Sequence, residues 1–116
     1  MTNELTMLSE TLREFAEERG WRSYHTPKNL AMALIVEAGE LVEQFQWATP
    51  EESSALSPEK ALAVQEEVAD VLIYLVELAD VLGIDLIDAA RDKIAKNAQK
   101  YPVAKARGNA LKYDKL

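Results

Sequence analysis

The chain contains no cysteine and only one histidine, and its 116 residues include four glycines, four prolines and two tryptophans. Without cysteine, disulfide bonds and thiolate metal ligands are excluded, and a reducing cytoplasm is the simplest expected location. No apolar run follows a basic N-terminal segment, so a signal peptide is not expected. The longest apolar stretch, residues 68–84, is interrupted by Asp70, Glu77 and Asp80, which argues against a membrane span.

Positive charge is also scarce, with 13 basic against 20 acidic residues and a net charge of −7. Such a surface repels a phosphate backbone, so a long nucleic acid is not an expected partner. A small anionic substrate is still compatible with it if metal ions lie between the charges. Because 48% of the residues are hydrophobic, the chain can bury one core, and residues 1–116 are expected to form a single domain.

The hydrophobic spacing and the helix-start residues predict four main helices. The first is amphipathic and ends near Gly20, with an apolar face made of Leu5, Leu8, Leu12 and Phe15. Thr26-Pro27 opens a second helix that runs towards Trp47. Thr49-Pro50 begins a short helical turn, and Ser57-Pro58 begins the third long helix.

Glycine and proline place the remaining boundaries. Gly83 ends the third helix after Leu82, Asp85 caps a fourth helix, and Tyr101-Pro102 ends that helix. Residues 103–116 are expected to form a polar tail. No strand pattern competes with these helices, so the predicted fold is all-α, a four-helix bundle-like domain.

The third helix is apolar on nearly every side from Val68 to Leu82. Such a helix is normally buried all round, which a domain of this size can hardly achieve alone. We therefore expect a neighbouring copy of the chain to cover part of it, in a homo-oligomer such as a dimer or a tetramer.

Two pairs of acidic residues interrupt the apolar helix faces. Glu37 and Glu40 lie three positions apart within LIVEAGELVEQFQW (34–47), and Glu67 and Asp70 repeat this spacing on the next long helix. Residues three apart share a helix face, with Cβ atoms about 5–6 Å apart. Two facing helices would therefore gather four carboxylates, which need a compensating charge to stay ionised.

Magnesium suits these donors because it takes carboxylate oxygens and water and bridges to phosphates, and manganese is an alternative. A di-iron site would need histidines in E-x-x-H motifs, but the sole histidine, His25, precedes a helix start. Acid pairs at this spacing also arise by chance and then form solvated faces. The two pairs stand out because both are embedded among leucine, isoleucine and valine.

A basic face is expected on the last long helix, where Lys93, Asn97 and Lys100 follow at spacings of four and three. By itself this pattern is typical of a solvated face near a helix C-terminus. Beside a metal–phosphate site, the same residues could hold phosphates.

Aromatic and polar residues near the helix ends supply further candidates. Trp21 and Trp47 each follow a helix end, where large aromatics usually cover a core or anchor an interface, although a nucleobase could stack on either. His25 and Asn29 flank a helix start, where capping and hydrogen bonding are the ordinary roles. Both could instead meet the sugar or base of a nucleotide.

Three motifs in order, EAGE (37–40), EVAD (67–70) and KIAKNAQKYP (93–102), resemble the signature of the all-α nucleoside triphosphate pyrophosphatases related to MazG. More narrowly, HTPKNL (25–30), GELVEQFQW (39–47) and DVLIYLVELA (70–79) are similar to the short dCTP pyrophosphatase branch. The likeness covers almost the whole chain.

The resemblance implies Mg²⁺-dependent hydrolysis of a (deoxy)nucleoside triphosphate, with dCTP or a modified dCTP as candidates, to the monophosphate and pyrophosphate. It implies that Glu37, Glu40, Glu67 and Asp70 bind the metal and that Glu37 or Glu40 orients or deprotonates the attacking water. It assigns the triphosphate to Lys93, Asn97, Lys100 and Tyr101. The base and sugar are assigned to Trp21, Trp47 and Tyr74, and His25 and Asn29 join them by position.

Two other interpretations fit the same residues. In one, the chain is a non-enzymatic helical module whose acids pair with lysine or arginine across an oligomer interface. In the other, it is a nucleotide-binding regulator. Mg²⁺ dependence and release of pyrophosphate distinguish the enzyme from both.

Overall fold

The computed structural model describes residues 3–116, and every regular element in that range is helical. This confirms the predicted all-α class. In chain order the elements are α1 (Glu4–Glu18), the 3₁₀ turn η1 (Arg22–Tyr24), α2 (Pro27–Glu43), α3 (Pro50–Ser53), α4 (Pro58–Leu82), α5 (Leu86–Lys100), α6 (Val103–Ala106) and the 3₁₀ turn η2 (Tyr113–Lys115). Along residues 3–116 no helix combines the length and the apolar composition that a membrane crossing needs.

The predicted helix starts are confirmed by their capping hydrogen bonds. The hydroxyl oxygen of Thr26 accepts from the backbone N–H of Asn29 at 3.2 Å, and Pro27 follows it at the first helical position of α2. Ser57 caps α4 and Asp85 caps α5 in the same way. These caps satisfy backbone donors that the first helical turn leaves without partners.

The helix ends also follow local chemistry. Gly83 ends α4 with φ of 67°, a left-handed conformation that glycine adopts without a Cβ penalty. The second helix stops at Glu43, and turns occupy residues 44–47, so Trp47 lies just beyond α2.

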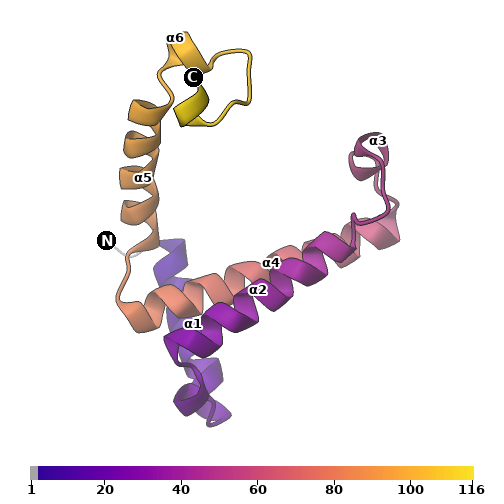
Figure 1. Cartoon of the computed structure of the whole chain (residues 1–116). Coiled ribbons are helices and arrows are strands. Elements are labelled where there is room, and N and C mark those ends of the chain that lie inside the picture. The colour runs from indigo at the N-terminus through magenta and orange to yellow at the C-terminus, as the bar shows by residue number, and fades with distance from the viewer. Residues whose placement is uncertain (1–2) are drawn as a thin grey trace. The chain divides into compact units, whose positions relative to one another are not determined.

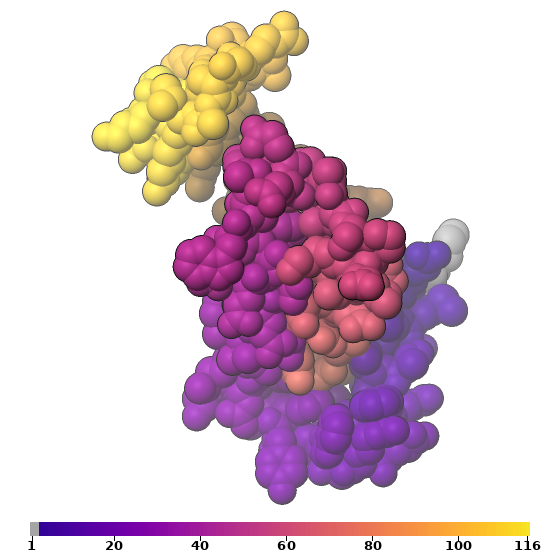
Figure 2. All heavy atoms as spheres, turned by 90° about the vertical axis from the view of Figure 1, so that its right-hand side faces the viewer, coloured from indigo at the N-terminus to yellow at the C-terminus, as the bar shows by residue number. Residues whose placement is uncertain are grey.

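The chain divides into two compact units, residues 1–84 and 85–116. In the first unit, α2 and α4 run side by side in opposite directions, with α3 in the connection between them (Figure 1). Helix α1 crosses this pair and packs on α4. The space-filling view, from the α3 end of the pair, shows the atoms of α2 and α4 in contact (Figure 2).

The core of the first unit is small. The hydrophobic side chains buried within residues 3–116 are Ala16, Leu30, Val76 and Ala79, all on α1, α2 and α4. By contrast, Val68, Leu72, Leu75 and Leu82 of the apolar helix α4 remain exposed. Within the first unit, α1 and α2 therefore do not bury α4 on every side.

The second unit consists of α5, α6 and η2. Its residues 103–116, expected to be a polar tail, contain two short helical segments. The ring of Tyr113 contacts Tyr101 edge-on, with centroids 6.2 Å apart, and Nζ of Lys100 lies 4.9 Å from the centroid of the Tyr113 ring. These contacts fold the end of the chain back onto the end of α5.

Candidate functional site

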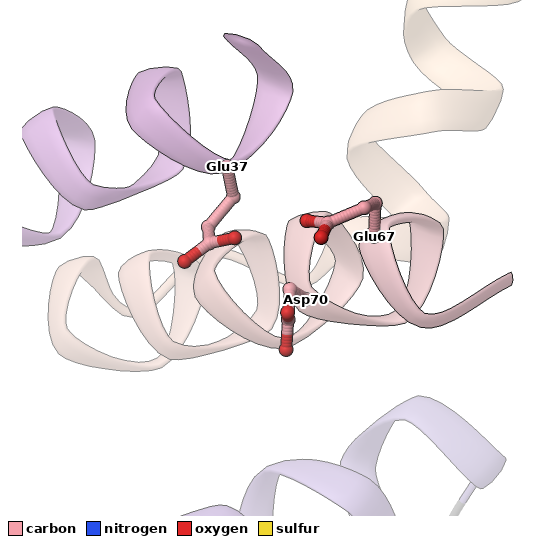
Figure 3. A group of neighbouring side chains, drawn as sticks. All are labelled: Glu37, Glu67 and Asp70. Carbon is pink, nitrogen blue, oxygen red and sulfur yellow. The ribbon is translucent and has the colours of Figure 1, made fainter. Parts of the chain in front are cut away.

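Three of the four predicted acids meet between α2 and α4. Glu37 projects from α2 toward α4, where Glu67 and Asp70 stand on successive turns (Figure 3). Each offers a carboxylate oxygen, and these oxygens lie within 4.8 Å of one another. The antiparallel pairing of α2 and α4 thus joins two acid motifs that are thirty positions apart in the sequence. We call these three residues the acid cluster.

Two oxygens of the acid cluster are buried without partners. Oε2 of Glu37 and Oε2 of Glu67 have almost no solvent contact and accept no hydrogen bond from any residue in the range 3–116. Leaving a buried charged group in this state is costly. The cost would disappear if a cation occupied the space between the oxygens.

The charges of the acid cluster oppose one another, as the pKa values show. Burial, together with a hydrogen bond and the charge of Glu40, raises the pKa of Glu37 to about 7. Burial and the charge of Glu40 also raise the pKa of Glu67 above its usual value. Glu40 is not among the residues whose oxygens lie within 4.8 Å, but its influence on both neighbours places it at the edge of the cluster.

A divalent cation fits this arrangement. All the donors are carboxylate oxygens, which hard ions such as Mg²⁺ and Mn²⁺ prefer. Neither cysteine nor histidine belongs to the cluster. The residues present can therefore hold a metal ion, and the donor type favours magnesium or manganese over zinc.

A pocket of about 330 Å³ adjoins the acid cluster. Its lining is mostly aromatic and aliphatic, with three polar groups, and consists of Leu12, Phe15, Trp21, His25, Asp70, Ile73, Tyr74 and Glu77. Asp70 belongs both to the acid cluster and to this lining. An apolar pocket with a few convergent polar groups is the usual form of a small-molecule site, and we call it the nucleoside pocket after the occupant proposed below.

Three predicted base or sugar residues lie in the nucleoside pocket: Trp21, His25 and Tyr74. The ring of Trp21 packs edge-on against Phe15, with centroids 5.8 Å apart, so one wall of the pocket is aromatic. Burial, and then the charges of Glu37, Glu77 and Asp70, raises the pKa of the Tyr74 hydroxyl. Tyr74 therefore enters the pocket as a neutral hydrogen-bonding group.

Two other predicted residues lie elsewhere. Trp47 is 88% exposed and does not line the pocket of this chain. The side-chain amide nitrogen of Asn29 donates to the backbone oxygen of Tyr24 at 2.9 Å, which stabilises the turn before α2. Their contacts with a base or sugar stay predictions.

The predicted phosphate ligands Lys93, Asn97, Lys100 and Tyr101 belong to the second unit. Lys93, Asn97 and Lys100 are exposed on α5, and Tyr101 caps the C-terminal end of that helix. The spacing of the first three puts them on one face of α5, as expected.

A group of charged residues that begins in the pocket wall and continues along α4 was not predicted. Nδ1 of His25 lies 3.1 Å from Oε2 of Glu77, close enough for an ion pair, although this oxygen accepts no well-angled hydrogen bond within residues 3–116. Burial raises the pKa of Glu77, while the charges of His25 and Arg22 oppose that rise. One turn further along α4, Asp80 binds both Arg13 and Arg22.

Comparison with known proteins places the chain in a family. The model of the MazG-like family matches residues 32–116, which include both acid pairs and the whole of α5. The chain belongs to the MazG-like family.

Among individual proteins, the chain is similar to dCTP pyrophosphatase 1 of Bos taurus, with 49% identity over 105 residues, and to that of Homo sapiens, with 47% identity over 105 residues. Each alignment covers 89% of this chain but 62% of the relative, so the chain spans about 62% of the length of these curated relatives. A crystal structure of a pyrophosphatase from Archaeoglobus fulgidus matches with a TM-score of 0.82 and 45% identity, over 88% of this chain and 95% of that one. The resemblance inferred from the sequence motifs is thus confirmed.

Proposed function

We propose that this chain hydrolyses a deoxynucleoside triphosphate, dCTP or a modified dCTP, to the monophosphate and pyrophosphate. The observation that carries the proposal is that Asp70 belongs to both the acid cluster and the nucleoside pocket. A nucleotide lying across Asp70 would have its phosphates at the carboxylates and its nucleoside among the aromatic side chains. The 49% identical relatives named for dCTP hydrolysis and the pyrophosphatase neighbour support this assignment.

The metal proposed for the site is Mg²⁺, with Mn²⁺ as a substitute. Glu37, Glu67 and Asp70 would hold it, with Glu40 at the edge of the cluster. When bound, such an ion polarises a phosphoryl oxygen and offsets the charge of the transition state. The two buried, unpartnered oxygens of Glu37 and Glu67 support this role.

Glu37 or Glu40 is proposed to orient and deprotonate the water that attacks the α-phosphorus. Tyr74 stands one turn beyond Asp70 and can hydrogen-bond to the sugar. Trp21 offers an aromatic face or edge to the base, and stacking of this kind contributes about 1–3 kcal/mol.

The triphosphate contacts are proposed for the basic face of α5, namely Lys93, Asn97, Lys100 and Tyr101. Three or four phosphate charges next to an acidic cluster need cations besides the metal. This face supplies them in a chain whose net charge is −7. The packing of α5 with α1, α2 and α4 in one four-helix bundle is part of this proposal.

A homo-oligomer is proposed as the working form, with a reducing cytoplasm as its setting. Apolar residues remain exposed along both central helices, for example Ile35 at 69% on α2 and Val68 at 50% on α4. Exposed apolar stripes of this size usually mark an interface. A second copy would cover the part of these faces that α5 leaves open in the proposed bundle.

The proposed reaction is tested by incubating the protein with dCTP and Mg²⁺ and separating the products by chromatography. Monophosphate and pyrophosphate are expected, and chelation of the metal should stop their formation. Glu67→Gln should lower kcat at least about 100-fold, because a metal ligand loses its charge. Glu66→Gln is the matched control, since its side chain is exposed on the neighbouring position of α4.

Two results would reject the proposal. Release of orthophosphate with a diphosphate product would mean that a different bond is cleaved. Tight nucleotide binding without turnover would instead favour the regulatory, non-enzymatic alternative.

A further inference from the structure

Glu77 places a carboxylate in the nucleoside pocket, and it does not belong to the acid cluster that would bind the metal. Its side chain lines the pocket and is 14% exposed. Since Oε2 is fully buried, the exposed part belongs to the other atoms of the side chain. A carboxylate in a mostly apolar wall is costly unless something binds to it.

The buried oxygen of Glu77 lies against a second residue of the pocket lining, His25. Nδ1 of His25, which follows η1, lies 3.1 Å from Oε2. The positive charge of Arg22 also acts on Glu77, and the negative charge of Asp80 opposes it. With Oε2 buried against His25, the other carboxylate oxygen of Glu77 is the one available to an occupant of the pocket.

The order of side chains along α4 matches the order of groups in a nucleotide. Asp70, Tyr74 and Glu77 follow at spacings of four and three, which keeps them on one helix face. The seven positions from Asp70 to Glu77 advance about 10 Å along the helix axis, roughly the length of a nucleoside. With the phosphates at Asp70 and the sugar beside Tyr74, the base reaches Glu77.

We propose that Glu77 is a specificity-determining residue that selects a nucleobase bearing an exocyclic amino group, cytosine among the pyrimidines, by accepting a hydrogen bond from that group. This role presupposes the proposed function, because it requires the nucleoside of the substrate to occupy the pocket.

The chemistry of the carboxylate gives the direction of the selection. An ionised carboxyl group only accepts hydrogen bonds, and the 4-amino group of cytosine is a donor that acidic side chains recognise. Uracil carries a carbonyl oxygen at the same position, so its lone pairs would face the negative charge of Glu77. A buried site that offers an acceptor thus rejects the oxo base more strongly than it favours the amino base.

The test compares dCTP with dUTP, whose bases differ only in the amino or oxo group and the ring nitrogen beside it. The wild-type protein should have a higher kcat/KM for dCTP. Glu77→Gln should reduce the dCTP/dUTP ratio by about tenfold or more, because the amide can turn either a donor or an acceptor to the base. Glu14→Gln, the same change at an exposed position of α1, should leave the ratio unchanged.

Binding of dCMP and dUMP, followed by tryptophan fluorescence, gives the same ratio without any reaction. If neither protein releases pyrophosphate but Glu77→Gln abolishes a preference for dCMP, the proposed hydrolysis is wrong, while nucleoside binding in the pocket and the selection by Glu77 stand. If pyrophosphate is released and the ratio is the same in wild type and variant, the role of Glu77 is wrong and the function stands. The role of Glu77 is also wrong if the wild type prefers dUTP, or if Glu77→Gln loses activity on dCTP and dUTP equally.

Discussion

Arg13 and Asp80, 67 positions apart in the chain, form a bidentate ion pair that fastens α1 to α4. Nε of Arg13 donates to Oδ2 of Asp80 at 3.2 Å, and NH2 donates to Oδ1. Arg22 adds a contact of 3.4 Å from the segment after α1. Because α1 also carries Leu12 and Phe15, this ion pair positions one wall of the nucleoside pocket.

Replacing Asp80 with asparagine should destabilise the fold by about 1–3 kcal/mol, the usual effect of removing an ionised hydrogen-bond partner. Asp80 is only 13% exposed, so solvent replaces little of the loss. The free energy of unfolding can be measured by urea titration. Asp92→Asn, at an exposed position of α5, should change it little.

The effect of Asp80→Asn should also depend on pH. The hydrogen bond from Arg13 lowers the pKa of Asp80 below its usual value of 3.8. A lowered carboxyl pKa contributes stability above the unfolded value, and this is lost as the pH falls through the folded value. The difference in the free energy of unfolding between wild type and Asp80→Asn should therefore reach its maximum above pH 3.8 and decrease below it. A constant difference would contradict the ion pair as its cause.

Stabilisation by Mg²⁺ should be greater at about pH 8 than at about pH 6. The pKa of Glu37 is raised from 4.5 to about 7, so the metal-free fold keeps a proton that the unfolded chain releases. The stability that this proton provides to the metal-free fold is present below pH 4.5 and is lost as the pH rises to about 7. Metal binding needs the ionised form, so apparent affinity should fall by about tenfold one unit below the pKa.

Thermal unfolding with and without Mg²⁺ at the two pH values measures this effect. Glu37→Gln should remove most of the metal-dependent shift, whereas Glu66→Gln should keep it. Equal shifts at both pH values would show that the metal does not compete with the proton on Glu37.

The helix boundaries were predictable because their causes are local. Thr26-Pro27, Ser57-Pro58 and Gly83 each act within one turn of the chain, and the structure places the boundaries there. The proximity of the two acid pairs was also predictable, since consecutive long apolar helices tend to pack as neighbours. The acidic residues that interrupt the apolar faces of α2 and α4 then lie at the contact between the two helices.

The charged residues that continue from the pocket wall along α4 could not be predicted in this way. The pairing of Arg13 with Asp80 depends on the angle at which α1 crosses α4, and no residue near either one encodes that angle. Glu77 is visible in the sequence as an interruption of the apolar stretch of α4, but its partner is His25, 52 positions earlier. Trp47 is expected beside a base, and its side chain is exposed on this chain, so that contact stays a prediction.

Ile35→Glu should weaken the proposed homo-oligomer. Ile35 is among the most exposed apolar side chains of α2, and a charge there would have to be buried against the partner at high cost. Sedimentation velocity should show a shift toward monomer at a concentration where the wild type is assembled. Thr11→Glu adds the same charge to an exposed polar position of α1 and should not change the sedimentation. A wild type that sediments as a monomer would reject the oligomer.

Lys93→Ala should lower kcat/KM for a nucleoside triphosphate by about 10- to 100-fold, because a charge-assisted hydrogen bond contributes about 1.5–3 kcal/mol. The appropriate control is Arg91→Ala. Arg91→Ala removes the same positive charge from the same helix. Arg91 lies two positions before Lys93, which places it about 200° around the helix axis, on the opposite face. A non-specific effect of net charge would appear equally in both variants, and it would weaken in both as salt is added. A contact between Lys93 and the phosphates would affect only Lys93→Ala, and mainly through KM if the contact is already formed in the bound substrate. Equal losses in the two variants would mean that α5 presents only a solvated basic face.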